Sequence, residues 1–248
     1  MCQDCQDLSA GLSRRHLLRH AATSAALGSA ALASGVLFGS SAATATTAAS
    51  TPGPSHAEVV ADLAAGNARH AKGIQTCTDF IANRAALSKG QRPIAIVVAC
   101  SDSRVAPEYV FDQAPGRVFV VRVAGNFVDE DGLASMEYAV GHLGVPVIMV
   151  LGHSSCGALT AAVEVEKSQA KLPGHLPALV ANLAAPVRAA LASKPADPVA
   201  AAIRENVAYT MKKLGTEHSE VATAIAEGKV KVVGGVYDLA TGLVAPVG

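Results

Sequence analysis

Two short stretches of the sequence place metal-binding and proton-moving groups just after apolar runs. Cys100 follows the run IAIVVA, and His153 and Cys156 follow the run VPVIMVLG. Two thiolates and one imidazole are a ligand set for Zn²⁺, and three protein ligands leave the fourth tetrahedral position open, as in catalytic sites. If the two runs are neighbouring strands, the three side chains meet at one edge of the sheet. The pattern therefore predicts a zinc site.

The same residues also have plainer interpretations. His153 could cap a helix or lie in the core, and each cysteine could be a small buried apolar side chain. In an oxidising compartment, Cys100 and Cys156 could form a disulfide and carry thiol redox chemistry. The only C-x-x-C pair lies within the first five residues, which counts against the redox alternative.

Asp102 and Arg104 share the turn that begins at Cys100. A guanidinium can bind both oxygens of a nearby carboxylate, which keeps the carboxylate ionised and oriented. Beside a metal, Asp102 could accept a hydrogen bond from bound hydroxide, or it could become a fourth ligand and close the site. Without a metal, the pair would be an ordinary salt bridge in a turn.

The elements that must position these groups indicate an α/β fold. Four short runs rich in Val and Ile are apolar at nearly every position, which predicts strands buried on both faces and a mainly parallel sheet. They cover 94–100, 117–123, 145–152 and 230–236. Strands that alternate with helices predict a central sheet flanked by helices. Helical patterns cover 56–73, 80–89, 132–143, 155–171, 176–192, 198–213 and 217–227.

The first fifty residues differ from the rest. Arg14 and Arg15 lie in a basic stretch, and residues 20–55 contain no Asp, Glu, Lys or Arg. A basic segment, a weakly apolar run and small residues are typical of an export signal, and the paired arginines predict the twin-arginine type. We expect a cleaved signal peptide and linker over 1–50, a single globular domain over 56–248, and export across the cytoplasmic membrane. The alternatives are a disordered leader or a poor transmembrane helix, and the run holds too many Ser, Thr and Gly to be a good membrane span.

Composition and cysteine content narrow the possible partners. The chain has 248 residues, half of them hydrophobic, and a formal net charge of zero. It has no basic block, which argues against nucleic acid as a partner. Cys2 and Cys5 fall in the expected leader, and Cys77 receives no role.

With these motifs in place, the sequence resembles the β-class carbonic anhydrases. The resemblance implies one zinc ion per subunit, held by Cys100, His153 and Cys156, with Asp102 and Arg104 as a catalytic dyad. It implies reversible hydration of carbon dioxide to bicarbonate and a proton, by attack of zinc-bound hydroxide. The matching segments are LAAGNARHAKG, GQRPIAIVVACSDSRV, PGRVFVVRVAGN, ASMEYAVGHLGVPVIMVLGHSSCGA and GGVYDLATG.

The resemblance also implies a substrate pocket and an assembly. Gln91, Phe119, Tyr138 and Gly157 match positions that line the family's pocket, partly across a dimer interface. It implies a homodimer, often paired into tetramers. From the residues alone, Gln91 could be loop surface, Phe119 core, and Tyr138 helix packing.

A further branch of the family binds bicarbonate at an allosteric site with a Trp, an Arg and a Tyr. Arg122 and Tyr237 match two of these, but Val97 stands in place of the Trp. We therefore expect an open, water-bound zinc and no such site.

The alternatives for function are hydrolysis of another small linear molecule, zinc binding without catalysis, and thiol redox chemistry. Beyond carbon dioxide and bicarbonate, the expected partners are a second copy of the chain and the twin-arginine export machinery.

Overall fold

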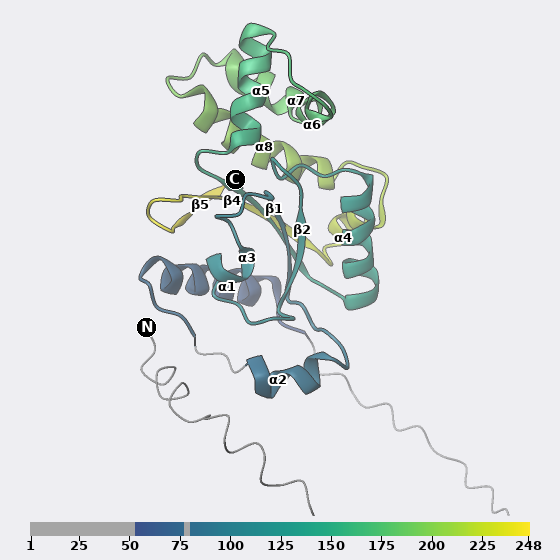
Figure 1. Cartoon of the computed structure of the whole chain (residues 1–248). Coiled ribbons are helices and arrows are strands. Elements are labelled where there is room, and N and C mark those ends of the chain that lie inside the picture. The colour runs from purple at the N-terminus through teal and green to yellow at the C-terminus, as the bar shows by residue number, and fades with distance from the viewer. Residues whose placement is uncertain (1–52, 77–79) are drawn as a thin grey trace, which may run out of the picture. The chain divides into compact units, whose positions relative to one another are not determined.

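Five strands form one sheet in the order β2-β1-β3-β4-β5, and the first four are parallel. The computed structural model describes residues 53–76 and 80–248 (Figure 1). The predicted α/β class with a mainly parallel sheet is confirmed, and all four predicted strands are present. The strands are β1 Ala95–Ala99, β2 Val118–Arg122, β3 Val147–His153, β4 Lys231–Tyr237 and β5 Val244–Val247.

Helices connect the strands, as the alternating pattern predicts. Two differences from the prediction concern helices: α3 is a single extra turn, and the pattern over 176–192 is two helices rather than one. A third is the edge strand β5, which is antiparallel to β4 and was not predicted. The helices are α1 His56–Ala71, α2 Phe80–Leu87, α3 Pro107–Val110, α4 Glu130–Leu143, α5 Gly157–Ser168, α6 Leu176–Ala181, α7 Ala184–Ala192, α8 Pro198–Leu214 and α9 Glu220–Ala226.

Strand β1, which lies between β2 and β3, is buried on both faces, because helices cover each side of the sheet. Val97 and its alternate neighbours pack against α1 and α3. Ile96 and Val98 pack on the other face against α4, α8 and α9. A third apolar cluster contains Cys100, Cys156 and side chains of α5, α6 and α7, which Figure 1 shows grouped beyond one end of the sheet. The predicted zinc ligands therefore lie at the carboxyl ends of the strands.

Helix α1 is tied to α3 and to the edge strand β5 by a buried asparagine. The side-chain amide of Asn67 donates to the carbonyls of Val110 and Gly242, and its oxygen accepts from Val244 N–H. One side chain thus joins α1, α3 and β5, which explains a polar group inside the apolar face of a helix. Within the described ranges, no helix combines the length and apolarity needed to cross a bilayer.

Candidate metal centre

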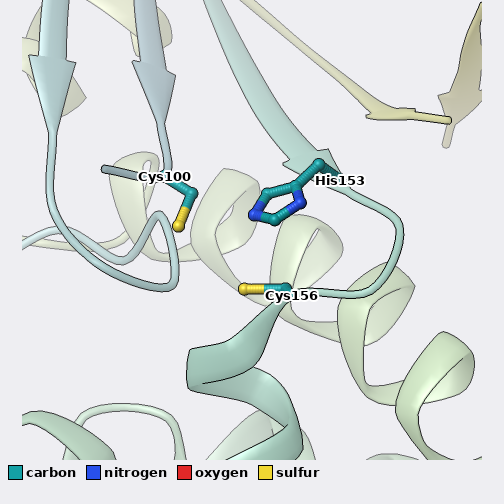
Figure 2. A group of neighbouring side chains, drawn as sticks. All are labelled: Cys100, His153 and Cys156. Carbon is teal, nitrogen blue, oxygen red and sulfur yellow. The ribbon is translucent and has the colours of Figure 1, made fainter. Parts of the chain in front are cut away.

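Cys100, His153 and Cys156 form one buried group at the carboxyl ends of β1 and β3. The strands are hydrogen-bonded neighbours, with Ala99 beside Leu151, so the residues that follow them are brought together. Their sulfur and nitrogen atoms all lie within 4.8 Å of one another (Figure 2). Cys156 is the N-cap of α5, so its sulfur also lies at the positive end of that helix.

The histidine is oriented to offer one ring nitrogen to a ligand. Nδ1 of His153 lies 2.9 Å from the carbonyl of Ser154, and since a carbonyl only accepts, Nδ1 carries the proton. Nε2 is then the atom with a free lone pair, and it is buried without a hydrogen-bond partner among the described residues. A buried polar atom left unpaired is costly, unless it binds a ligand such as a metal ion.

The two cysteines are free thiols in this structure, so the disulfide alternative does not describe it. The two thiols are linked: a hydrogen bond from the Cys156 thiol lowers the pKa of Cys100, and the same hydrogen bond, together with burial, raises the pKa of Cys156. A divalent cation would allow both to ionise. The two thiolates and the unpaired imidazole nitrogen therefore fit Zn²⁺. They supply three of its usual four ligands, which leaves one coordination position for another ligand.

Arg104 holds Asp102 beside this group. Its Nε donates to Oδ1 at 2.9 Å and its Nη2 to Oδ2 at 2.6 Å, while the Arg104 backbone N–H donates to Oδ1 at 3.0 Å. These bonds, led by the side-chain pair, keep the pKa of Asp102 well below its usual range. Asp102 Oδ2 is 3.8 Å from His153 Nε2, so the carboxylate lies next to the metal ligands without bonding to them.

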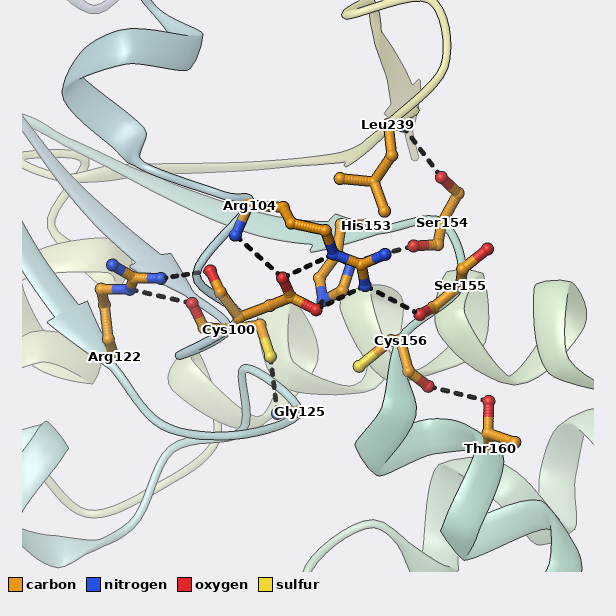
Figure 3. Close-up of polar contacts among 11 residues, drawn as sticks. Cys100, Arg104, Arg122, Gly125, His153, Ser154, Ser155, Cys156, Thr160 and Leu239 are labelled. Atoms are coloured by element: carbon orange, nitrogen blue, oxygen red, sulfur yellow. Dashed lines mark hydrogen bonds and ion pairs between the residues drawn. The ribbon is translucent and has the colours of Figure 1, made fainter.

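The next strand supplies contacts that sequence reasoning missed. Arg122, at the end of β2, donates to the carbonyls of Cys100 at 2.9 Å and Asp102 at 2.8 Å (Figure 3). Gly125 N–H donates to Cys100 Sγ at 3.2 Å. The glycine in VAGN, directly after a strand, is the only sequence signal for this turn.

The other predicted site residues lie in three places. Gly157 begins α5 next to Cys156. Phe119 and Tyr138 face each other with ring centroids 6.4 Å apart, and Tyr138 is half exposed. Gln91 is not brought to the metal group: it lies before the start of β1, in a cavity of about 580 Å³ that contains none of the ligands.

The positions that correspond to the allosteric bicarbonate site have other contacts in this structure, and Val97 and Tyr237 belong to one apolar cluster. Arg122 is engaged by backbone carbonyls, whereas the Tyr237 hydroxyl lies 2.9 Å from His70 Nε2. Val97 is completely buried in β1.

Comparison with known proteins identifies the family. Residues 95–244 match the family model described as carbonic anhydrase. Carbonic anhydrase 2 of Mycobacterium tuberculosis is 39% identical over 181 residues, covering 73% of this chain and 87% of the relative. This chain belongs to the carbonic anhydrase family.

Solved structures place the chain in the β-class. A tetrameric β-carbonic anhydrase of the ascomycete Sordaria macrospora has 32% sequence identity and a TM-score of 0.61, over 66% of this chain and 85% of that one. The Coccomyxa β-carbonic anhydrase has 30% identity and a TM-score of 0.58, over 66% and 75%. The chain is thus a β-class carbonic anhydrase with a zinc site, and carbon dioxide hydration is the activity that fits it.

Proposed function

We propose that this carbonic anhydrase hydrates carbon dioxide reversibly to bicarbonate and a proton, with Cys100, His153 and Cys156 as the zinc ligands. The observation that carries the assignment is Nε2 of His153, which is buried beside two thiols and has no hydrogen-bond partner among the described residues. When bound there, zinc acts as a Lewis acid and lowers the pKa of water to about 7.

Asp102 and Arg104 are the proposed catalytic dyad. Arg104 occupies both carboxylate oxygens of Asp102, which keeps the carboxylate ionised and fixed in direction. From that position Asp102 is an acceptor that orients the O–H of the attacking water toward carbon dioxide. Because the dyad is intact in this structure, we propose that Asp102 stays with Arg104 rather than becoming a fourth zinc ligand.

Gln91, Phe119, Tyr138 and Gly157 are proposed to line the substrate pocket in a homodimer. Gly157 adjoins the metal group within the chain, whereas Gln91 lies before the opposite end of β1 from Cys100. Gln91 can therefore reach a zinc site only if a second copy supplies it. Support for assembly comes from the exposed Tyr138 beside edge strand β2, and from the Sordaria macrospora relatives, which are described as tetrameric.

We also propose that residues 1–50 direct export by the twin-arginine machinery, ahead of a catalytic domain over 56–248. The leader lies outside the described residues, so its support is the sequence pattern around Arg14 and Arg15. Replacing both arginines by lysine should leave the enzyme in the cytoplasm. Cys2, Cys5 and Cys77 also lie outside the described residues.

The proposal is tested by two variants measured for both zinc content and hydration rate. Cys100→Ser should lose zinc and activity together, because a serine hydroxyl is a poor zinc ligand at neutral pH. Asp102→Asn should retain one zinc per chain and lose about 100-fold or more in kcat, because a neutral amide cannot replace the oriented acceptor. Ser103→Ala, exposed in the same turn, is the control and should behave as wild type. A fully active Asp102→Asn enzyme would rule out the dyad.

A further inference from the structure

The turn after β2 is built around one residue, Gly125, whose N–H contacts the sulfur of Cys100. Gly125 N–H donates to Cys100 Sγ at 3.2 Å (Figure 3). Gly125 has φ +90°, which side-chain-bearing residues rarely adopt. A Cβ there would also come within 2.8 Å of the Leu183 side chain and 3.3 Å of Ala158 Cβ. Glycine is therefore favoured by the backbone conformation, and a larger residue would also have to displace the Leu183 side chain.

A buried asparagine on another element holds this turn. Asn206 lies in α8 and is 1% exposed, and its Nδ2 donates to the Gly125 carbonyl at 2.8 Å. Ile203 and Val207, its neighbours on the helix, belong to the apolar core. Both polar groups of Gly125 are thus engaged, one by α8 and one by the thiol.

An asparagine at position 206 costs folding free energy. Its Oδ1 is buried without a hydrogen-bond partner among the described residues, as is Nδ2 of Asn126 in the turn itself. A buried amide with an unpaired atom destabilises a fold, so an apolar side chain would suit the core better. The one bond that Asn206 makes to the turn is the contact that explains its presence.

We infer that Asn206 is a positioning residue for the metal-binding sulfur of Cys100. Acting through Gly125, it keeps that N–H directed at Sγ, although Asn206 itself touches neither the metal nor the substrate. An N–H···S bond fixes the direction of a thiolate and withdraws electron density from it, and such outer contacts tune metal affinity. The inference rests on the proposed role of Cys100 as a zinc ligand.

The test compares Asn206→Leu with wild type in the full chain. Zinc affinity is measured by competition with a chelator, and the sulfur-to-metal charge-transfer band is recorded after loading with Co²⁺. We expect zinc affinity to fall about 10- to 100-fold, the usual effect of losing an outer-shell contact. The band should move to lower energy, because a thiolate without its hydrogen bond donates electrons more readily.

Thr210→Val is the matched control. Thr210 is as buried as Asn206 and lies one turn further along α8, so this variant also removes a polar group from the same helix. It should leave both the zinc affinity and the cobalt band at wild-type values. If Asn206→Leu does not fold, Asn206→Ala is measured in the same way, since it removes the donor without adding bulk.

The outcomes separate this inference from the proposed function. An Asn206 variant with wild-type zinc affinity and an unmoved band would show that Asn206 only supports the fold, and would overturn the inference. Equal band shifts in the Asn206 and Thr210 variants would also overturn it. Wild-type protein that binds no zinc would instead overturn the zinc function itself.

Discussion

At the scale of single residues, the metal group is held by backbone contacts as much as by its own side chains. Arg122 donates to the carbonyls of Cys100 and Asp102, so one guanidinium fixes the turn that carries a thiol and a carboxylate. A forked donor is suited to two acceptors at once, whereas an ammonium binds as a point charge.

Arg122→Lys should therefore weaken the site while keeping the charge. We expect zinc affinity and hydration rate to fall about tenfold, because a lysine can satisfy only one of the two carbonyls at a time. Arg117→Lys is the matched control at the opposite end of β2, where Arg117 pairs with Asp62 at 2.8 Å, and it should change neither quantity. Equal values for Arg122→Lys and wild type would refute this role.

At the scale of elements, α1 docks onto α3 through a close approach that only glycine permits. A Cβ on Gly66 would lie 1.8 Å from the carbonyl oxygen of Phe111, which is backbone and cannot rotate away. Gly66→Ala should lower the free energy of unfolding by about 3 kcal/mol, at the upper end for an overpacked core. Urea unfolding measures the change.

Gly141→Ala provides the matched control for that variant. Gly141 is an exposed glycine of α4, and a Cβ there would meet nothing within 4 Å. It should raise the free energy of unfolding by about 0.5–1 kcal/mol through the better helix propensity of alanine. Similar losses for both variants would show that the contact between α1 and α3 is not the cause.

Asp112 links the end of α1 to α3, and its contribution should depend on pH. Burial raises the pKa of Asp112, but hydrogen bonds from Arg69 and Thr76 outweigh it, so the pKa is lowered overall. Asp112 has φ +45°, which asparagine also tolerates, so Asp112→Asn removes the charge without forcing the backbone.

Asp112→Asn should be less stable than wild type at pH 7 by about 1–2 kcal/mol. The expected loss is small because Arg69 is partly exposed and solvent weakens its ion pair. Because the pKa of Asp112 is lower in the folded than in the unfolded chain, its ionised form stabilises the fold. This stabilisation is complete above the unfolded pKa of about 3.9 and is lost as the pH falls through the folded pKa. The difference in thermal stability should therefore shrink below about pH 4. A difference that persisted unchanged at pH 3 would contradict the ion-pair account.

The elements also show what the sequence could and could not reveal. The apolar runs predicted β1 to β4, and the groups that follow β1 and β3 predicted the ligands, because parallel strands end at one edge. The strand β5 was not predicted because its sequence, VAPV, is short and contains a proline. The contact between Asn206 and Gly125 spans 81 residues and follows no periodic pattern, so only the folded chain shows it.

At the scale of the whole molecule, the separation of Gln91 from the metal group makes a prediction about assembly. If a partner subunit supplies Gln91, then Cys100→Ser and Gln91→Ala subunits should complement each other. A mixed dimer would contain one site with both the zinc ligands and an intact glutamine. Co-expression of tagged variants, purification of the mixed species and a hydration assay test this arrangement.

The purified mixed dimer should recover about half of the wild-type rate, because one of its two sites is complete. The Cys100→Ser homodimer should be inactive and the Gln91→Ala homodimer slow. The control mixes Cys100→Ser with His153→Ala subunits, which leave no site complete if ligands come from one chain. A mixed dimer no faster than the average of its two parent homodimers would show that Gln91 does not act across subunits.

The most direct test of the central claim is zinc content and carbon dioxide hydration measured on one sample of the full chain between about pH 6 and 9. The account predicts one zinc per chain and a hydration rate that rises through a pKa near 7, since Asp102 is held by Arg104 and, as proposed, would leave the fourth metal position to water. Activity confined to above about pH 8 would mean that Asp102 closes the site at neutral pH. Zinc without hydration at any pH, or two oxidised thiols and no zinc, would contradict the account.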